Sequence, residues 1–174
     1  VGANYWAAKK GRDALKITWD NSKAETRSSD AIFADYKKLL DKPGHEARKA
    51  GKGVAALKGP GKVITADFEF PYLAHAPMEP MNATIEYRPG QSCLVTSGSQ
   101  MPTVDQAVAG AILGLKQDQV KINTTLAGGS FGRKATPDGD LIAECAQIAK
   151  HINGRAPVKL MWSREDDIRS GKYR

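Results

Sequence analysis

A glycine-rich segment is the part of the sequence best suited to holding an anion. Residues 127–134 are Ala-Gly-Gly-Ser-Phe-Gly-Arg-Lys and lie between an expected strand and an expected helix. Glycine lets the backbone approach a ligand closely, and exposed amides in such a turn can bind an oxyanion or a phosphate. Arg133 and Lys134 are expected to add positive charge at its mouth. The glycine spacing fits neither a Walker A loop nor a dinucleotide fingerprint, and on this segment alone a plain chain-reversing turn is the favoured interpretation.

A proline-rich segment holds the second set of polar side chains. Residues 71–82 contain three prolines, with His75 and Glu79 four positions apart. On a helix this spacing would place both side chains on one face, but the prolines exclude a regular helix. One imidazole does not make a zinc site. We therefore expect a rigid loop in which Glu79 accepts hydrogen bonds from the backbone.

Other polar residues lie at the ends of expected elements. Gln100 precedes a helix, where its amide could face a ligand as donor and acceptor or simply contact the start of the helix. Residues 163–167, Ser-Arg-Glu-Asp-Asp, suit a solvated turn or a helix N-terminus better than a calcium loop. Cys93 and Cys145 lack basic neighbours in sequence, and two cysteines make neither a disulfide framework nor a cysteine-only zinc site.

Composition and charge restrict the class of protein. Of 174 residues, 41% are hydrophobic and 26% charged, which is typical of one or two globular domains. The net charge is +7, with 14 basic and 7 acidic residues in positions 1–62 and 12 of each in the remainder. Clustered lysines can bind nucleic acid, but residues 42–62 contain no aromatic side chain for base stacking. Five glycines and two prolines there indicate a linker, and we expect no nucleic-acid partner.

Hydrophobic periodicity predicts helices packed on one mixed β-sheet, an α+β fold. Helices are expected at residues 5–15, 28–40, 102–115 and 138–152, and strands at residues 15–19, 63–70, 83–87, 93–96, 120–124 and 158–162. Pro89-Gly90 should turn the chain between two of the strands. The clearest helix should bury a face made of Val104, Ala107, Val108, Ala111, Ile112 and Leu115.

Four segments in this order resemble the molybdenum-binding subunit of the xanthine dehydrogenase and aldehyde oxidase family. They are Tyr72–Pro80, Gly98–Gln100, Gly128–Lys134 and Val158–Asp166. The closest branch is the large (beta) subunit of isoquinoline 1-oxidoreductase-like enzymes, often named aldehyde dehydrogenases. By this resemblance, residues 63–174 begin a molybdopterin-binding domain, residues 1–20 are the tail of an α/β hammerhead domain, and residues 21–62 are a helix and linker. The chain is then expected to be an internal fragment of a longer protein.

The resemblance implies an oxidoreductase. Such enzymes hydroxylate an aldehyde or an N-heterocycle with oxygen from water and pass electrons from molybdenum to 2Fe-2S clusters. In this branch the clusters lie on a separate small subunit, and a cytochrome c is a candidate further partner. The cofactor would be molybdopterin, commonly the cytosine dinucleotide form in bacteria. The resemblance favours a periplasmic or membrane-associated location over the cytoplasm.

The resemblance also assigns residues to the site. Gln100 would lie near the molybdenum and its apical oxo ligand, and no residue of this chain would ligate the metal directly. Backbone amides of the turn would hold the metal's oxygen ligand and the pterin, with Phe131 shaping the site. The cofactor-binding residues would be Gln100, Gly128, Gly129, Ser130, Phe131, Gly132 and Arg133.

The sequence departs from the xanthine-type members at three positions. Those members have glycine where Ser130 and Arg133 stand, and glutamate where Ala135 stands. Because that glutamate helps hold purines, Ala135 argues against xanthine as substrate. The family's catalytic glutamate lies far downstream, so we expect no catalytic residue here and neither tight cofactor binding nor turnover by this chain alone. The alternative is a stand-alone ligand-binding or interaction module whose glycine-rich turn holds a phosphate or another oxyanion.

Overall fold

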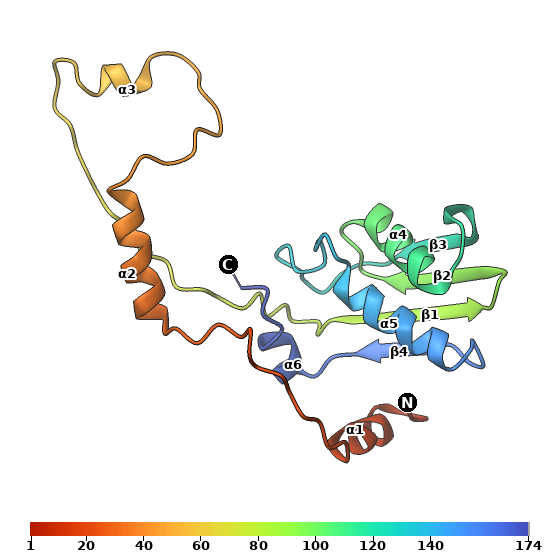
Figure 1. The fold of residues 1–174 in the computed structure, drawn as a ribbon. Coiled ribbons are helices and arrows are strands. Elements are labelled where there is room, and N and C mark those ends of the chain that lie inside the picture. The colour runs from red at the N-terminus through yellow and green to blue at the C-terminus, as the bar shows by residue number, and fades with distance from the viewer. Residues whose placement is uncertain (174) are drawn as a thin grey trace. The chain divides into compact units, whose positions relative to one another are not determined.

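The computed structural model describes residues 1–173 and divides the chain into two compact units, Val1–Pro71 and Tyr72–Arg174 (Figure 1). The first contains α1 (Tyr5–Asp13), α2 (Ser29–Leu40) and the short α3 (Gly53–Ala56). The second contains β1 (Asn82–Arg88), β2 (Ser92–Ser97), α4 (Pro102–Leu113), the 3-10 helix η1 (Gln117–Gln119), β3 (Val120–Thr124), α5 (Asp140–His151), β4 (Val158–Met161) and α6 (Arg164–Ile168). Among the described residues, no helix is both long and apolar enough to cross a membrane.

The two main helices of the first unit begin at capping side chains. Asn4 Oδ1 accepts a hydrogen bond from the Ala7 amide at 3.0 Å, and Ser28 Oγ accepts one from the Ala31 amide at 3.3 Å. Such caps satisfy amides that have no partner within the helix. Both helices were expected from the sequence. No described residue of this unit is buried, so it has no hydrophobic core.

Two strands expected in the first unit are not formed. Residues 15–19 and 63–70 have no strand assignment, and Trp19 and Phe68 are 73% and 77% exposed. A strand has no hydrogen bonds within itself and forms only beside another strand. Neither segment has such a neighbour among residues 1–173. β-Branched and aromatic residues favour strands because they pack well on a pleated sheet, and this unit has no sheet for them to pack on.

The second unit is built on a four-stranded mixed sheet in the order β3-β2-β1-β4. β1 pairs antiparallel with β2 and with β4, while β2 and β3 run parallel. Pro89 and Gly90 make the expected turn between β1 and β2, with Gly90 at a φ of 69°. The four strands expected in this unit are therefore confirmed, and so is the α+β class.

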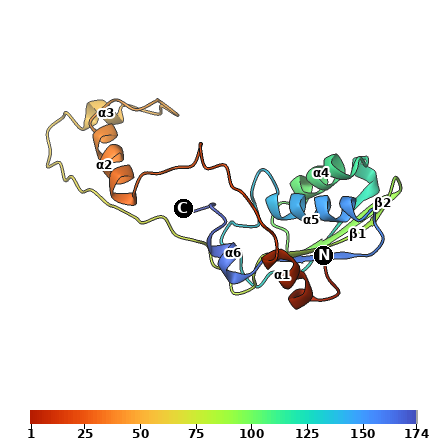
Figure 2. The same ribbon diagram turned by 60° about the horizontal axis from the view of Figure 1, so that its bottom comes forward.

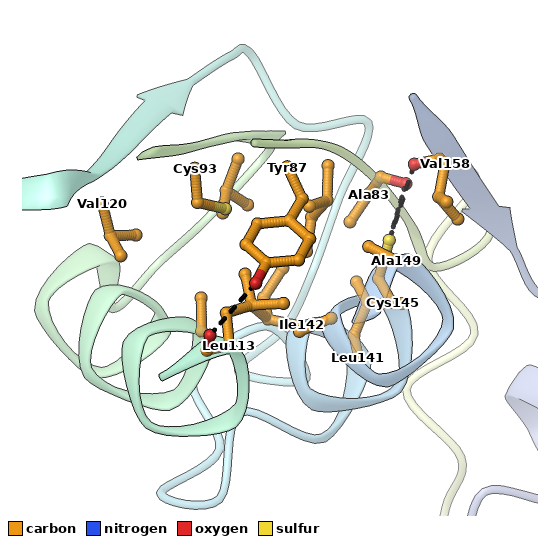
Figure 3. Packing of buried hydrophobic residues seen from close by; sticks show 14 of the residues in the cluster. Ala83, Tyr87, Cys93, Leu113, Val120, Leu141, Ile142, Cys145, Ala149 and Val158 are labelled. Carbon is orange, nitrogen blue, oxygen red and sulfur yellow. Dashed lines mark hydrogen bonds between the residues drawn. The ribbon is translucent and has the colours of Figure 1, made fainter. Parts of the chain in front are cut away.

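Helices α4 and α5 cover one face of the sheet, as the edge-on view shows (Figure 2). The hydrophobic core lies between these helices and the sheet. Along β1 buried side chains alternate with more exposed ones, and Ala83, Ile85 and Tyr87 are buried. Tyr87 Oη donates a hydrogen bond to the Leu113 carbonyl of α4 at 3.3 Å, and Cys145 Sγ of α5 lies 3.7 Å from the Ala83 carbonyl (Figure 3). Burial raises the pKa of the Cys145 thiol to about 12, so this cysteine is a core side chain rather than a nucleophile.

The buried face of α4 only partly matches the expected one, of which Leu115 is buried and Ile112 packs against the core. Ala107 and Ala111 are exposed, and the helix instead buries Asp105, Ala109, Gly110 and Leu113. An ideal Cβ on Gly110 would lie 3.1 Å from the Leu115 carbonyl oxygen and 3.7 Å from the Val120 side chain. The missing side chain therefore lets α4 lie close to the segment that follows it and to β3. Asp105 is accommodated because its Oδ2 accepts a hydrogen bond from Ser99 Oγ at 2.5 Å. A pattern of hydrophobic side chains cannot reveal a face made of glycine, alanine and a hydrogen-bonded carboxylate.

Candidate functional site

In the second unit, two loops and the segment before α4 meet at one end of the strands, where β1 begins and β2 and β3 end. The proline loop, residues 72–82, leads into β1, and the glycine turn, residues 127–134, follows β3. The Gly128 amide donates to Glu79 Oε2 at 2.7 Å, and the Glu79 amide donates to the Gly128 carbonyl at 3.0 Å. The prediction that Glu79 accepts backbone hydrogen bonds is thus confirmed.

Glu79 is also held by two side chains. Lys134 Nζ lies 2.9 Å from its Oε2, and Asn82 Nδ2 lies 2.9 Å from its Oε1. Burial alone would raise the pKa of Glu79, but the hydrogen bonds from Lys134, Asn82 and Gly128 outweigh it and hold the pKa at about 2. The carboxylate is therefore charged throughout the neutral range and ties the proline loop to both ends of the glycine turn.

Gly128 and Gly129 are required because the glycine turn lies very close to the proline loop. An ideal Cβ on Gly128 would lie 2.6 Å from Glu79 Cβ, and one on Gly129 would lie 3.2 Å from Pro77 Cβ. Gly129 also adopts a φ of 102°, which a residue with a side chain rarely tolerates. The turn is packed against the proline loop and is more than a simple reversal of the chain.

The expectation that Arg133 and Lys134 place positive charge at the mouth of the turn is wrong. Both side chains are buried, at 1% and 2% exposure. The Arg133 guanidinium binds Asp140 through two hydrogen bonds of 3.0 and 2.7 Å and lies 5.2 Å from the ring centroid of Trp162. These two buried charges stabilise the turn by pairing with the carboxylates of Asp140 and Glu79. A cofactor-binding role for Arg133 stays a prediction, and its side chain is already engaged by protein groups.

Four consecutive residues of the turn have backbone donors that no protein group among the described residues accepts. Among residues 1–173, no acceptor is found for the amides of Gly129, Ser130, Phe131 and Gly132. The backbone reverses sharply here, with φ of 102° at Gly129, 55° at Phe131 and 97° at Gly132. Consecutive amides in left-handed and turn conformations form a concave donor surface that suits anionic or oxo oxygens. The Phe131 ring is 62% exposed beside it.

Gln100 lies against this donor surface. Ser130 Oγ donates to Gln100 Oε1 at 2.6 Å, and the same hydroxyl accepts the Lys134 amide at 2.9 Å. The sequence placed Gln100 and the glycine turn near one ligand, and the structure brings them into contact. Gly98 lets the segment before α4 lie close to the start of the glycine turn, since an ideal Cβ at this position would lie 2.8 Å from Ala127 Cβ.

Sequence reasoning missed Asp140 and Arg164 as supports of the site. Arg164 Nη2 donates to the Pro77 carbonyl at 2.6 Å, and its Nη1 contacts Asp167 Oδ2 at 2.7 Å. The expected helix N-terminus after β4 is α6, capped by Ser163. The sequence did contain a signal for Asp140: it is an acidic residue at the start of the helix that follows the basic pair Arg133-Lys134. No group of three or more metal-ligating side chains was found among residues 1–173.

Comparisons with known proteins agree on one family. The molybdopterin cofactor-binding domain model matches residues 39–174. The isoquinoline 1-oxidoreductase subunit beta of Brevundimonas diminuta is 30% identical over 100% of this chain and 23% of that protein. The membrane-bound aldehyde dehydrogenase [pyrroloquinoline-quinone] of Gluconacetobacter polyoxogenes is 27% identical over 100% of this chain and 22% of its own length. The xanthine dehydrogenase of Dictyostelium discoideum is 27% identical over 61% of this chain and 8% of that protein.

The chain spans less than a quarter of the length of these relatives. Among solved structures, it is similar to quinoline 2-oxidoreductase from Pseudomonas putida 86, with 18% identity and a TM-score of 0.48 over 55% of this chain and 12% of that one. The family match includes the proline loop, Gln100 and the glycine turn. The resemblance inferred from four motifs is therefore confirmed, and the chain belongs to the molybdopterin cofactor-binding domain family.

Proposed function

We propose that this chain is part of the large subunit of a molybdenum hydroxylase and that its glycine turn holds oxygen atoms of a molybdenum-bearing molybdopterin. The observation that carries the proposal is the row of amides at residues 129–132, which have no acceptor among residues 1–173. These donors fit oxo and phosphate oxygens. The nearest carboxylate, Glu79, is already neutralised by Lys134, so it does not repel such a ligand.

The bound cofactor would supply the two-electron oxidation of an aldehyde or an N-heterocycle with oxygen from water. The chain's own contribution is positioning and hydrogen bonding. Glu79 and the Arg133–Asp140 pair fix the turn so that its amides need no rearrangement when a ligand binds. The exposed Phe131 ring forms an apolar wall beside the donors.

The partners and the cofactor form belong to the same proposal. The name "subunit beta" of one relative supports a partner subunit. We propose that this partner is small and carries 2Fe-2S clusters, with a cytochrome c as onward acceptor. We propose the cytosine dinucleotide form of molybdopterin, which acid hydrolysis would release as cytidine monophosphate. We propose a periplasmic or membrane-associated bacterial location, which cell fractionation tests; the name "membrane-bound" of another relative supports the membrane-associated alternative.

Metal and pterin analysis of the full-length protein, purified with its neighbours, tests the proposal. We expect near-stoichiometric molybdenum, a fluorescent oxidised pterin, and iron on the partner subunit. A protein without molybdenum and pterin, from cells that make other molybdoenzymes, would overturn it. Binding of inorganic phosphate alone would then favour a phosphate-binding module, and release of a quinone would indicate a different redox cofactor.

A pair of matched variants tests the role of the turn. Phe131→Ala removes a ring that is 62% exposed, and Leu126→Ala, the control, removes a side chain that is 99% exposed on the same loop. We expect both variants to keep the unfolding free energy within about 0.5 kcal/mol, because neither side chain is buried. Only Phe131→Ala should change substrate selection or cofactor retention. Equal effects of both changes would argue against the turn as the site.

A further inference from the structure

The Ser130 hydroxyl joins two parts of the donor surface. Its side chain is buried, with the residue 7% exposed. Its oxygen accepts a hydrogen bond from the Lys134 amide at 2.9 Å and lies 2.6 Å from Gln100 Oε1. The first contact belongs to the turn itself, and the second reaches the segment that precedes α4.

These two contacts determine which way the Gln100 amide faces. The Ser130 hydroxyl donates its single proton to Gln100 Oε1, while its oxygen accepts a hydrogen bond from the Lys134 amide. A separation of 2.6 Å suits O–H···O and is shorter than the usual range of about 2.7–3.2 Å for N–H···O. The atom facing Ser130 is therefore the carbonyl oxygen, and the NH2 group faces away from it.

The NH2 group of Gln100 is consequently a further donor beside the turn. No acceptor for Gln100 Nε2 is found within residues 1–173, and the side chain is exposed. The four amides of residues 129–132 lie on the adjoining turn and are also donors. An amide turned the other way would place a carbonyl oxygen beside them and repel an anionic or oxo ligand.

We propose that Ser130 is a positioning residue that orients the Gln100 amide, so that this corner of the site accepts an oxo or phosphate oxygen and disfavours a group that presents N–H or O–H. This inference rests on the proposed function and deepens it. A glycine at position 130 has no hydroxyl and could not select the orientation. Ser130 would therefore contribute to ligand selection without being a catalytic residue.

A double-mutant cycle in the full-length protein with its partners tests the proposal. The measurement is the rate at which molybdenum and pterin are released on dialysis, followed by metal analysis and fluorescence, for wild type, Ser130→Ala, Gln100→Ala and the double variant. We expect release to be about tenfold faster in Gln100→Ala, the loss of one hydrogen bond to a charged or oxo group. Ser130→Ala should be about threefold faster, because it removes only the preorganisation of the donor.

The double variant should release cofactor no faster than Gln100→Ala, because Ser130 acts through that amide. Ser130→Thr, which keeps the hydroxyl, should restore slow release. Multiplied effects in the double variant, or failure of threonine to rescue a variant that keeps its thermal stability, would overturn the role of Ser130 alone. Absence of molybdenum and pterin from wild type would overturn the proposed function and this inference together. Molybdenum lost ahead of pterin would assign the bound oxygen to the metal, and joint loss would assign it to a phosphate.

Discussion

Residues 1–71 and residues 72–173 carry comparable helix signals but differ in what they bury. In the first region α1 and α2 are capped and amphipathic, yet side chains such as Trp6 and Leu40 stay 71% and 75% exposed. In the second region α4 and α5 pack on a sheet, and every buried hydrophobic side chain of the described residues lies there. Local sequence is enough to form a capped helix, whereas burial requires distant segments whose apolar faces meet.

The two regions also differ in how they pair charge. Arg27 binds Glu25 and Asp35 with side chains that are about half exposed. Arg133 binds Asp140 with a side chain that is 1% exposed. Both arginines have carboxylate partners at 2.7 Å, so burial is the main variable between them.

The largest expected effect is the loss of the buried arginine. Arg133→Ala should lower the unfolding free energy by about 3–5 kcal/mol, because it leaves the Asp140 carboxylate without its buried partner and the Trp162 ring uncovered. Arg27→Ala, the matched control, should leave the unfolding free energy nearly unchanged, because its ion pairs are exposed to solvent. Urea denaturation followed by circular dichroism measures both values. Similar costs at the two sites would mean that Arg27 is covered in solution.

A second pair concerns two isoleucines that the sequence placed in strands. Ile85→Ala should cost about 2–5 kcal/mol, because its side chain is 0% exposed between the sheet and the helices. Ile64→Ala should cost less than about 0.5 kcal/mol, because that side chain is 82% exposed. The same denaturation measurement applies. A large effect at Ile64 would show that residues 63–70 bury their side chains after all.

A third pair separates backbone strain from steric fit. Gly154 and Gly51 adopt left-handed φ angles of 63° and 68°. An ideal Cβ on Gly154 would overlap the Tyr87 carbonyl oxygen, whereas one on Gly51 would meet nothing within 4 Å. Gly154→Ala should therefore destabilise the protein by about 1–3 kcal/mol more than Gly51→Ala. Equal costs would indicate that the turn after α5 shifts easily to make room.

The same contrast explains which parts of the structure were predictable from sequence. The four strands and two main helices of the second region follow from periodicity, and α1 and α2 of the first region were expected at residues 5–15 and 28–40. The segments at 15–19 and 63–70 were predicted wrongly as strands, since a strand depends on a partner that periodicity does not specify. A sequence pattern identifies a preference, and pairing decides whether it is realised.

The candidate site was predictable in its membership but not in its electrostatics. The proline loop, Gln100 and the glycine turn were identified from residue types, and the structure places them in contact. The burial of Arg133 and Lys134 could not be foreseen, because their partners Asp140 and Glu79 are 7 and 55 positions away. Basic residues beside a glycine turn suggest an exposed anion site unless such distant carboxylates are known to neutralise them.

A fourth pair concerns the pH dependence of stability at two glutamates. The pKa of Glu79 is held at about 2, with burial opposed by hydrogen bonds from Lys134, Asn82 and Gly128. Because the folded pKa lies below the ordinary value of 4.5, Glu79 stabilises the fold above that pH and loses this contribution as the pH falls toward 2. Glu25 also has a pKa of about 2, from its hydrogen bonds with Arg27, but it is exposed to solvent.

Glu79→Gln should therefore lower the unfolding free energy at pH 7 by about 1–3 kcal/mol and flatten its decline between pH 4.5 and 2. Glu25→Gln should leave both the stability and its pH dependence nearly unchanged, because solvent screens an exposed ion pair. Denaturation at a series of pH values measures the two slopes. If Glu25→Gln flattened the profile and Glu79→Gln did not, the acid sensitivity would arise in the first region, and the carboxylate that joins the proline loop to the glycine turn would contribute little to the fold.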